Sequence, residues 1–314
     1  MNPRQIPDDT LSSVLRAYSL RAAVDANPIL CGRWQFGTSG SGHATFHLLG
    51  EGSAFLHLRE GEPIPLSAGD LVLMPHDAWH RLAPVDRLVD SEIRMVREGS
   101  GPATVFVCGH FEFATGRRNP VIVGLPELIV VREADAGDRH QRLAELMLLE
   151  VSQRDTGYGP VIDRLADTLF VMAVRHHLSH APLGRGLVAA LADDHLRRAL
   201  DAMHSDPGDA WTLDRLAAVA LLSRSAFAER FAERVGQTPI EYLTHWRMLL
   251  AERRLHEPGM TVALVAGEFG YSTEGAFRKA YRRIHGHAPG RVGRMLANLR
   301  AKPKAGRNII DSKS

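Results

Sequence analysis

Two stretches of the chain resemble each other at a constant offset of 50 residues: LDRLAAVALLSRSAFAERFAERVGQTP at 213–239 and ALVAGEFGYSTEGAFRKAYRRIHGHAP at 263–289. The repeat keeps aromatic, glycine and proline positions in register, pairing Phe227 with Phe277, Gly236 with Gly286 and Pro239 with Pro289. A fixed period of this kind is typical of one supersecondary unit that is built twice. Each copy predicts a helix, a short turn, a second helix and a Gly-x-x-Pro stop, which together make a helix-turn-helix unit.

The second helix of each copy is predicted to have a buried side and an exposed side. Ser223 and Thr273 are expected to N-cap these helices. Aromatic pairs spaced four apart are expected to anchor them, namely Phe227 with Phe231 and Phe277 with Tyr281. In a DNA-recognition helix the exposed residues near the N-terminus reach base edges. The candidate DNA-contacting residues are Arg224, Ser225, Ala228 and Glu229 in the first copy and Glu274, Gly275, Arg278 and Lys279 in the second.

The region around the repeat is basic and contains a helix that would connect the two units. A helix predicted at 240–255 would hold them at a fixed separation, and successive major-groove faces of B-DNA lie about 34 Å apart. Between Trp211 and Arg300 there are 14 Arg and Lys against 8 Asp and Glu, a net charge of +6. Helix-turn-helix geometry also occurs in helical bundles that bind no DNA. The duplication, the caps and the basic surface together favour a DNA-binding domain.

Residues 187–300 resemble the C-terminal DNA-binding domain of the AraC/XylS family of bacterial transcription regulators. The matching stretches are LAAVALLSRSAFAERFAERVGQTPIEYLTHWRMLLAERRL and GEFGYSTEGAFRKAYRRIHGHAP. The sequence departs from the family pattern at Gly267 and at 290–293. The resemblance implies double-stranded promoter DNA as a partner, together with RNA polymerase, an effector and a second copy of the chain. Whether the protein activates or represses stays open.

The N-terminal part is predicted to be a small β-barrel followed by helices, so the fold class is α+β with an all-α C-terminal domain. Short apolar runs between 30 and 131, punctuated by Gly and Pro, predict strands, including one at 31–36. Residues 139–180 change to a helical period, and these helices either cap the barrel or mediate dimerisation. The predicted boundaries are 1–180 for a sensor domain with its helical extension, 181–186 for a linker, 187–300 for the DNA-binding domain and 301–314 for a disordered basic tail.

The segment FHLLGEGSAFLHLREGEPIPLSAGDLVLMPHDAWHRL resembles a cupin, specifically the cupin-like sensor domain of some AraC-family regulators. Cupin enzymes hold a metal with a His-x-His pair, a glutamate and a distant histidine, and the His-x-His pair is missing from this segment. His47 and His80 come from different strands and are candidate ligands for a transition metal, with help from Cys108, His110 or water. The alternative is a pair of hydrogen-bonded barrel histidines. If the apolar face of the strand at 104–113 is the core, Cys108 and His110 face outward and the metal loses its third ligand.

The two cysteines, Cys31 and Cys108, are candidates for a redox sensor. A pair of thiols in a sensor domain can form a reversible disulfide on oxidation. Some regulators that resemble this chain respond to oxidants through cysteines. The alternative is that both are small buried apolar residues.

Composition excludes several classes of protein. The chain of 314 residues is long enough for about two domains, with 45% hydrophobic and 24% charged residues. It has no apolar run of ~18 residues, no signal-peptide pattern and too few cysteines for a disulfide scaffold, so we expect a cytoplasmic protein without a membrane span. The sequence predicts a sequence-specific DNA-binding transcription regulator that is not an enzyme, controlled by a small molecule, metal or oxidant. Alternatives are a metal-dependent cupin enzyme carrying a DNA-binding tail and a constitutive architectural DNA binder.

Overall fold

The computed structural model describes residues 9–88, 102–113, 119–180 and 184–289. Among these residues, 11–197 with 233–236 form one compact unit, here called the β-rich unit, and the rest form a second, here called the helical unit. The units divide between residues 197 and 198, inside a helix, and not at the linker predicted at 181–186. The predicted domain boundaries stay predictions. Residues 290–300 of the predicted DNA-binding domain and the predicted tail at 301–314 lie outside the described residues.

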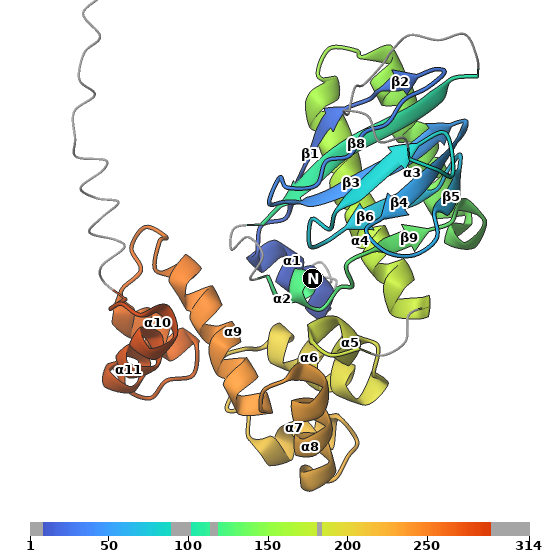
Figure 1. The fold of residues 1–314 in the computed structure, drawn as a ribbon. Helices are drawn as coiled ribbons and strands as arrows, with labels where there is room; N and C mark the ends of the chain where they lie inside the picture. The colour runs from blue at the N-terminus through green and yellow to red at the C-terminus, as the bar shows by residue number, and fades with distance from the viewer. Residues whose placement is uncertain (1–8, 89–101, 114–118, 181–183, 290–314) are drawn as a thin grey trace, which may run out of the picture. The chain divides into compact units, whose positions relative to one another are not determined.

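The β-rich unit contains two sheets (Figure 1). Its strands are β1 (Arg21–Ala26), β2 (Ile29–Leu30), β3 (Ala44–Glu51), β4 (Ser53–Leu58), β5 (Ile64–Ser67), β6 (Leu71–Met74), β7 (His80–Ala83), β8 (Thr104–Glu112) and β9 (Ile129–Val131). The larger sheet has the order β1-β8-β3-β6-β9, with β2 also pairing with β8, and the smaller sheet has the order β5-β4-β7. The predicted β-rich N-terminal region is therefore confirmed. The strand expected at 31–36 is wrong, because β2 ends at Leu30 and Phe36 makes only an isolated bridge to Leu82.

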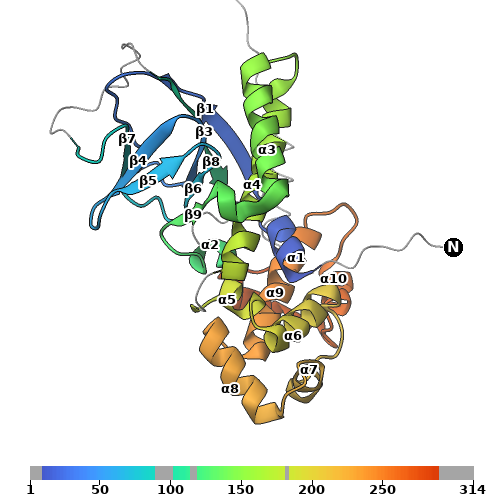
Figure 2. The same ribbon diagram turned by 90° about the vertical axis from the view of Figure 1, so that its right-hand side faces the viewer.

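Helices cover the outer face of the larger sheet, and the smaller sheet covers its inner face (Figure 2). The helices of this unit are α1 (Thr10–Ala17), α2 (Pro120–Val123), α3 (Glu133–Gln153), α4 (Tyr158–His180) and α5 (Leu187–Leu191). On the outer face Phe111 lies between Phe46 and Phe170, with ring centroids 4.9 and 4.8 Å away. Asp163 and Asp167 of α4 accept hydrogen bonds from backbone amides of the edge strand β1, which satisfies groups that would otherwise be open to another strand.

The space between the two sheets is filled by a core in which aromatic and aliphatic side chains interdigitate. Trp34, Phe36 and Phe106 meet with ring centroids 5.4–5.9 Å apart. Aliphatic side chains from both sheets, including Leu49, Leu56 and Leu82, complete the cluster.

The helical unit is the duplicated structure that the repeat predicts. Its helices are α6 (Asp194–Ser205), α7 (Leu213–Val219), α8 (Arg224–Val235), α9 (Pro239–Arg254), α10 (Val262–Glu268) and α11 (Glu274–His285). The starts of α8 and α11 differ by the predicted 50 positions. Gly236 and Gly286 follow them with φ of 84° and 75°, a left-handed conformation that glycine adopts at low cost.

The helix α9 contributes to the cores of both helix-turn-helix units. Tyr242 near its start packs against Phe231 of the first unit, with ring centroids 5.7 Å apart. Met248 and Ala251 nearer its end join the cluster that contains Phe277 and Tyr281 of the second unit. Because α9 packs against both units along its length, it fixes their separation.

Candidate nucleic-acid interface and ligand sites

The two candidate recognition helices, α8 and α11, are capped and anchored in the same way. The hydroxyl of Ser223 accepts a hydrogen bond from the amide of Ala226 at 3.3 Å, and that of Thr273 accepts one from Ala276 at 3.2 Å. The four predicted anchors are buried, namely Phe227, Phe231, Phe277 and Tyr281. Each helix therefore has one face fixed in a core and the opposite face available to a partner.

The predicted DNA-contacting residues lie on the available faces. Seven of the eight are exposed, and Ala228 is half-buried. The two faces differ chemically at equivalent positions, because Arg278 and Lys279 of α11 stand where α8 has Ala228 and Glu229. Arg278 forms an ion pair with Glu274 one turn earlier, with 2.5 Å between Nη2 and Oε1. This contact holds the guanidinium on the exposed side of α11.

A second set of contacts braces the two helix-turn-helix units against each other. Arg247 of α9 donates to the carbonyl oxygens of Pro207 and Asp209, both at 2.6 Å. Gly208 and Gly270 approach so closely that a Cβ on Gly270 would lie 2.4 Å from the Gly208 carbonyl oxygen. Arg254 of α9 also pairs with Glu268 of α10 at 2.9 Å. The brace gives the two exposed faces a defined spacing.

In the β-rich unit, His47 and His80 converge between the two sheets. Their Nε2 atoms lie 2.9 Å apart, and the Thr38 hydroxyl lies 3.3 and 3.4 Å from them. The other ring nitrogen of His47 lies 3.1 Å from Cys108 Sγ, and His80 Nδ1 lies 2.8 Å from the Ala78 carbonyl. The expectation that Cys108 faces outward is wrong: β8 is covered on both sides, and Cys108 is 4% exposed in the core between the sheets.

One set of tautomers satisfies this buried chain with neutral groups. Cys108 donates to His47 Nδ1, His47 donates from Nε2 to His80, and His80 donates from Nδ1 to Ala78. Burial lowers the pKa of His47 well below its usual value and also lowers the pKa of His80, while burial raises the pKa of the Cys108 thiol. Among the described residues no third His, Cys, Asp or Glu joins His47 and His80 in one ligand set. The pair therefore fits a hydrogen-bonded chain better than a three-ligand metal site.

The two cysteines are both free thiols. Cys108 lies on β8, and the register of β2 against β8 places Cys31 at a distance from it. Leu30, which precedes Cys31, pairs with Thr104. Thr104 is four positions before Cys108, about 13 Å at ~3.3 Å per residue. A disulfide requires Cα atoms within about 7 Å, so this pair would need a backbone shift to form one.

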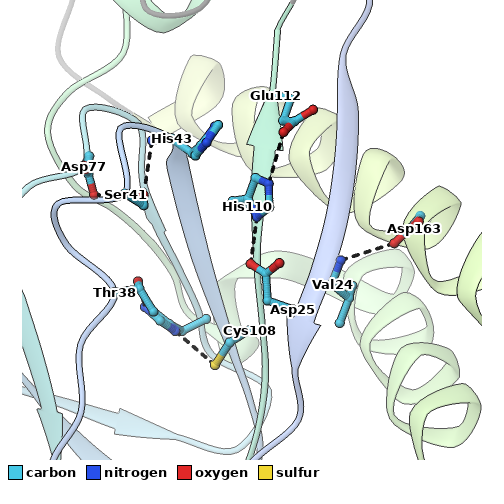
Figure 3. Close-up of polar contacts among 11 residues, drawn as sticks. Val24, Asp25, Thr38, Ser41, His43, Asp77, Cys108, His110, Glu112 and Asp163 are labelled. Atoms are coloured by element: carbon cyan, nitrogen blue, oxygen red, sulfur yellow. Dashed lines mark hydrogen bonds and ion pairs between the residues drawn. The ribbon is translucent and has the colours of Figure 1, made fainter.

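A second polar cluster lies where β3 begins and β8 ends (Figure 3). His43, His110 and Glu112 each offer one ligand atom, and these atoms lie within 4.8 Å of one another. His110 Nδ1 also lies 2.7 Å from Asp25 Oδ2. The sequence predicts His110 only as a helper for His47 and His80 and does not group it with His43. The alternation of polar residues on both strands is visible in the sequence, but the pairing of those strands is not.

Comparison with known proteins identifies the family. The family model for cupins matches residues 9–179, and the model for a helix-turn-helix domain matches residues 216–295. An AraC-like transcription regulator from Streptomyces antibioticus is 32% identical over 90% of this chain and 97% of its own length. The chain belongs to the AraC family of transcription regulators. A further AraC-family relative is the RCS-specific transcriptional activator RclR of Escherichia coli, 28% identical over 93% of this chain and 99% of its own.

Solved structures similar to this AraC-family chain include the DNA-binding domain of AdpA in complex with a target DNA. That domain is 29% identical, covers 35% of this chain and 96% of its own, and has a TM-score of 0.31. ToxT of Vibrio cholerae is 10% identical, covers 90% of this chain and 98% of its own, and has a TM-score of 0.35. The sequence relationship, rather than these low scores, establishes the family.

The family membership confirms several predictions. The protein is an AraC-type DNA-binding transcription regulator with an N-terminal cupin domain, and its relatives are regulators rather than enzymes. The enzyme alternative has no counterpart among these relatives. In the part of the chain that the structure describes, no helix combines the length and apolar character needed to cross a membrane.

Proposed function

We propose that this AraC-family protein reads a specific promoter sequence with α8 and α11. The observation that carries the proposal is the shared geometry of the two helices, each capped, anchored by buried aromatics and exposed on the opposite face. The eight predicted contact residues lie near the N-terminal ends of these helices, where recognition helices reach base edges. We retain all eight as the proposed interface.

The two helices are proposed to read different half-sites. Arg278 and Lys279 give α11 two cations where α8 has Ala228 and Glu229. Arginine binds the O6 and N7 atoms of guanine with two hydrogen bonds, whereas glutamate accepts from cytosine N4. The bound sequence is therefore expected to be asymmetric, with the α11 half-site more dependent on basic residues.

The first prediction tests DNA reading at Arg278. Sequences selected by the purified full chain from a random duplex pool should share an asymmetric motif. Arg278→Ala should weaken binding to that motif by roughly 1–3 kcal/mol if Arg278 contacts a base. The measurement is competition binding at several salt concentrations, since phosphate contacts make the affinity fall as salt rises.

Arg142→Ala is the matched control. Arg142 is an exposed arginine in an i,i+4 ion pair with Asp138 on α3, as Arg278 is with Glu274 on α11. It should bind the selected motif like the parent chain. Equal affinity of the parent and Arg278→Ala, or a selection that yields no shared motif, would contradict the proposal.

We further propose that the cupin domain controls DNA binding through the chain formed by Cys108, His47 and His80. This buried chain links residues of β3, β7 and β8, so a change at any member is transmitted to both sheets. The name of the relative RclR, an RCS-specific activator, suggests redox sensing. Because burial raises the pKa of the Cys108 thiol, oxidation would require the unit to open around this residue. A transition metal at His47 and His80, or a small molecule bound elsewhere in the cupin domain, is the other effector class.

The second prediction concerns the buried hydrogen-bonded residues Cys108, His47 and His80. In a reporter driven by the native promoter, the Cys31→Ser, Cys108→Ser double variant should lose the response to peroxide or hypochlorite if the effector is an oxidant. The His47→Gln, His80→Gln variant should lose a response to added metal if the effector is a metal. If both variants respond to these agents like the parent chain, control by this buried chain is wrong.

A further inference from the structure

We propose that His43, His110 and Glu112 bind a divalent first-row transition metal, with Asp25 positioning His110. The site lies at the start of β3 and the end of β8 and is separate from the buried pair (Figure 3). His43 and His47 are four residues apart, about 13 Å along an extended chain at ~3.3 Å per residue. One ion therefore cannot bridge the two histidine clusters.

The strand register brings the three side chains to one place. Antiparallel pairing sets Ala44 opposite Phe111 and Thr45 opposite His110. His43 and Thr45 share a face of the chain at β3, and His110 and Glu112 share a face of β8, because side chains alternate along a strand. The rings of His43 and His110 consequently lie with centroids 4.7 Å apart.

Asp25 supplies the arrangement that commonly supports a metal-bound histidine. It lies at an irregularity of β1, where Val24 pairs with Gly109 and Ala26 with Cys108, and a bulge of this kind redirects a side chain. Its carboxylate accepts a hydrogen bond from His110 Nδ1 at 2.7 Å. That contact places the proton on Nδ1 and leaves the Nε2 lone pair free to bind a metal.

The distances match ligands of one ion. His110 Nε2 lies 3.5 Å from Glu112 Oε1, close to the ~3.4 Å that separates two ligands bonded at about 2.0–2.2 Å in tetrahedral geometry. The ligand atoms of all three residues lie within 4.8 Å of one another, so small side-chain rotations complete the set. Two imidazoles and one carboxylate favour Zn²⁺ and related first-row ions over Ca²⁺ or Mg²⁺, which prefer oxygen ligands.

Two further features bear on a ligand at this place. His43 and Glu112, though not His110, are among the residues that line a pocket of about 200 Å³. Thr45, the register partner of His110, is 2% exposed, and its hydroxyl has no hydrogen-bond partner among the described residues. A buried hydroxyl without a partner is unfavourable, and a metal-bound water at this position would satisfy it.

The experiment is a titration of the purified full chain with Co²⁺, followed by visible absorption and by calorimetry. The parent should bind one ion at this site with the spectrum of nitrogen and oxygen ligation. Glu112→Gln, which changes a largely exposed side chain, and His110→Gln should each weaken binding at least tenfold. Asp25→Asn should weaken it roughly 10–100-fold, as expected for a residue that orients a ligand.

His256→Gln, at an exposed histidine outside both histidine clusters, is the control variant and should bind Co²⁺ with the affinity of the parent. Circular dichroism should show that all variants retain the parent's secondary structure. The proposal is overturned if the parent binds no Co²⁺ or if folded Glu112→Gln and His110→Gln bind it like the parent. It is also overturned if His80→Gln loses the ion while His110→Gln keeps it.

Discussion

His204 illustrates how one buried side chain makes stability depend on pH. It is 6% exposed, and its Nε2 atom lies at hydrogen-bond distance, 2.7 Å, from the Tyr242 hydroxyl oxygen. Its ring also stacks on that of Trp246, with centroids 4.0 Å apart. Burial lowers the pKa of His204 to about 3. An unfolded histidine has a pKa near 6.5, so between these values the folded state binds fewer protons than the unfolded state.

The third prediction follows from that difference. The contribution of His204 to stability is complete above pH ~6.5 and is lost as the pH falls toward about 3, by up to ~1.4 kcal/mol per pH unit. Urea denaturation at pH 7.5 and 5.5 should show a smaller loss of unfolding free energy for His204→Gln than for the parent chain. His245→Gln, at an exposed histidine, should behave like the parent. Equal losses in the parent and His204→Gln would show that His204 does not remain neutral in the fold.

At the scale of the element, α9 begins with a complete capping box. The Thr238 hydroxyl accepts from the amide of Glu241, and the Glu241 carboxylate accepts from the amide of Thr238 at 3.0 Å. Proline follows at the first helical position, where its missing N–H costs nothing. These contacts define the start of the helix that carries both helix-turn-helix units.

The fourth prediction compares two threonines of this region. Thr238→Ala should lower the free energy of unfolding by about 1 kcal/mol, because the amide of Glu241 loses its acceptor and the Glu241 carboxylate loses its bond from the Thr238 hydroxyl. Thr244→Ala is the control, since the Thr244 hydroxyl only bonds the Ile240 carbonyl within the same helix, and its effect should stay within about 0.5 kcal/mol. Chemical denaturation of both variants measures the difference. Equal effects would show that the cap does not stabilise α9.

At the scale of the whole molecule, α3 and α4 cover one face of the larger sheet and also carry apolar side chains that are exposed. Leu146 and Leu149, three positions apart on α3, are 45% and 50% exposed, and Val161 of α4 is 45% exposed. Leu146 and Leu149 are neighbours on one face of α3, and contiguous exposed apolar side chains mark surfaces that pair with a partner. We propose that these helices both cap the cupin domain and form a homodimer.

The fifth prediction tests this dimer. The Leu146→Glu, Leu149→Glu variant should sediment as a monomer at concentrations where the parent sediments as a dimer, because burying the new charges would be unfavourable. Leu264→Glu, at a leucine of α10 that is 58% exposed, is the control and should sediment like the parent. A monomeric parent, or a double variant that remains dimeric, would contradict the proposed interface.

The amino-acid sequence by itself determined the helical half of this protein. The aromatic anchors, the caps at Ser223 and Thr273 and the Gly-x-x-Pro stops act within a few residues of one another, so their pattern predicts each helix and its buried face. Local sequence patterns also predict the principal strands between Gly and Pro turns. The strand predicted at 31–36 is wrong, because apolar residues there enter the core without pairing along a strand.

The tertiary structure alone decided which residues of the cupin domain meet. Strand alternation put Cys108, His110 and Glu112 on one face, but the sequence does not show that β8 is covered on both sides. It also does not show that β3 and β1 are the neighbours of β8, which bring His43 and Asp25 to His110. Strand order and register depend on contacts between residues far apart in the chain, and a shift of one residue in register would send every side chain of the strand to the opposite face.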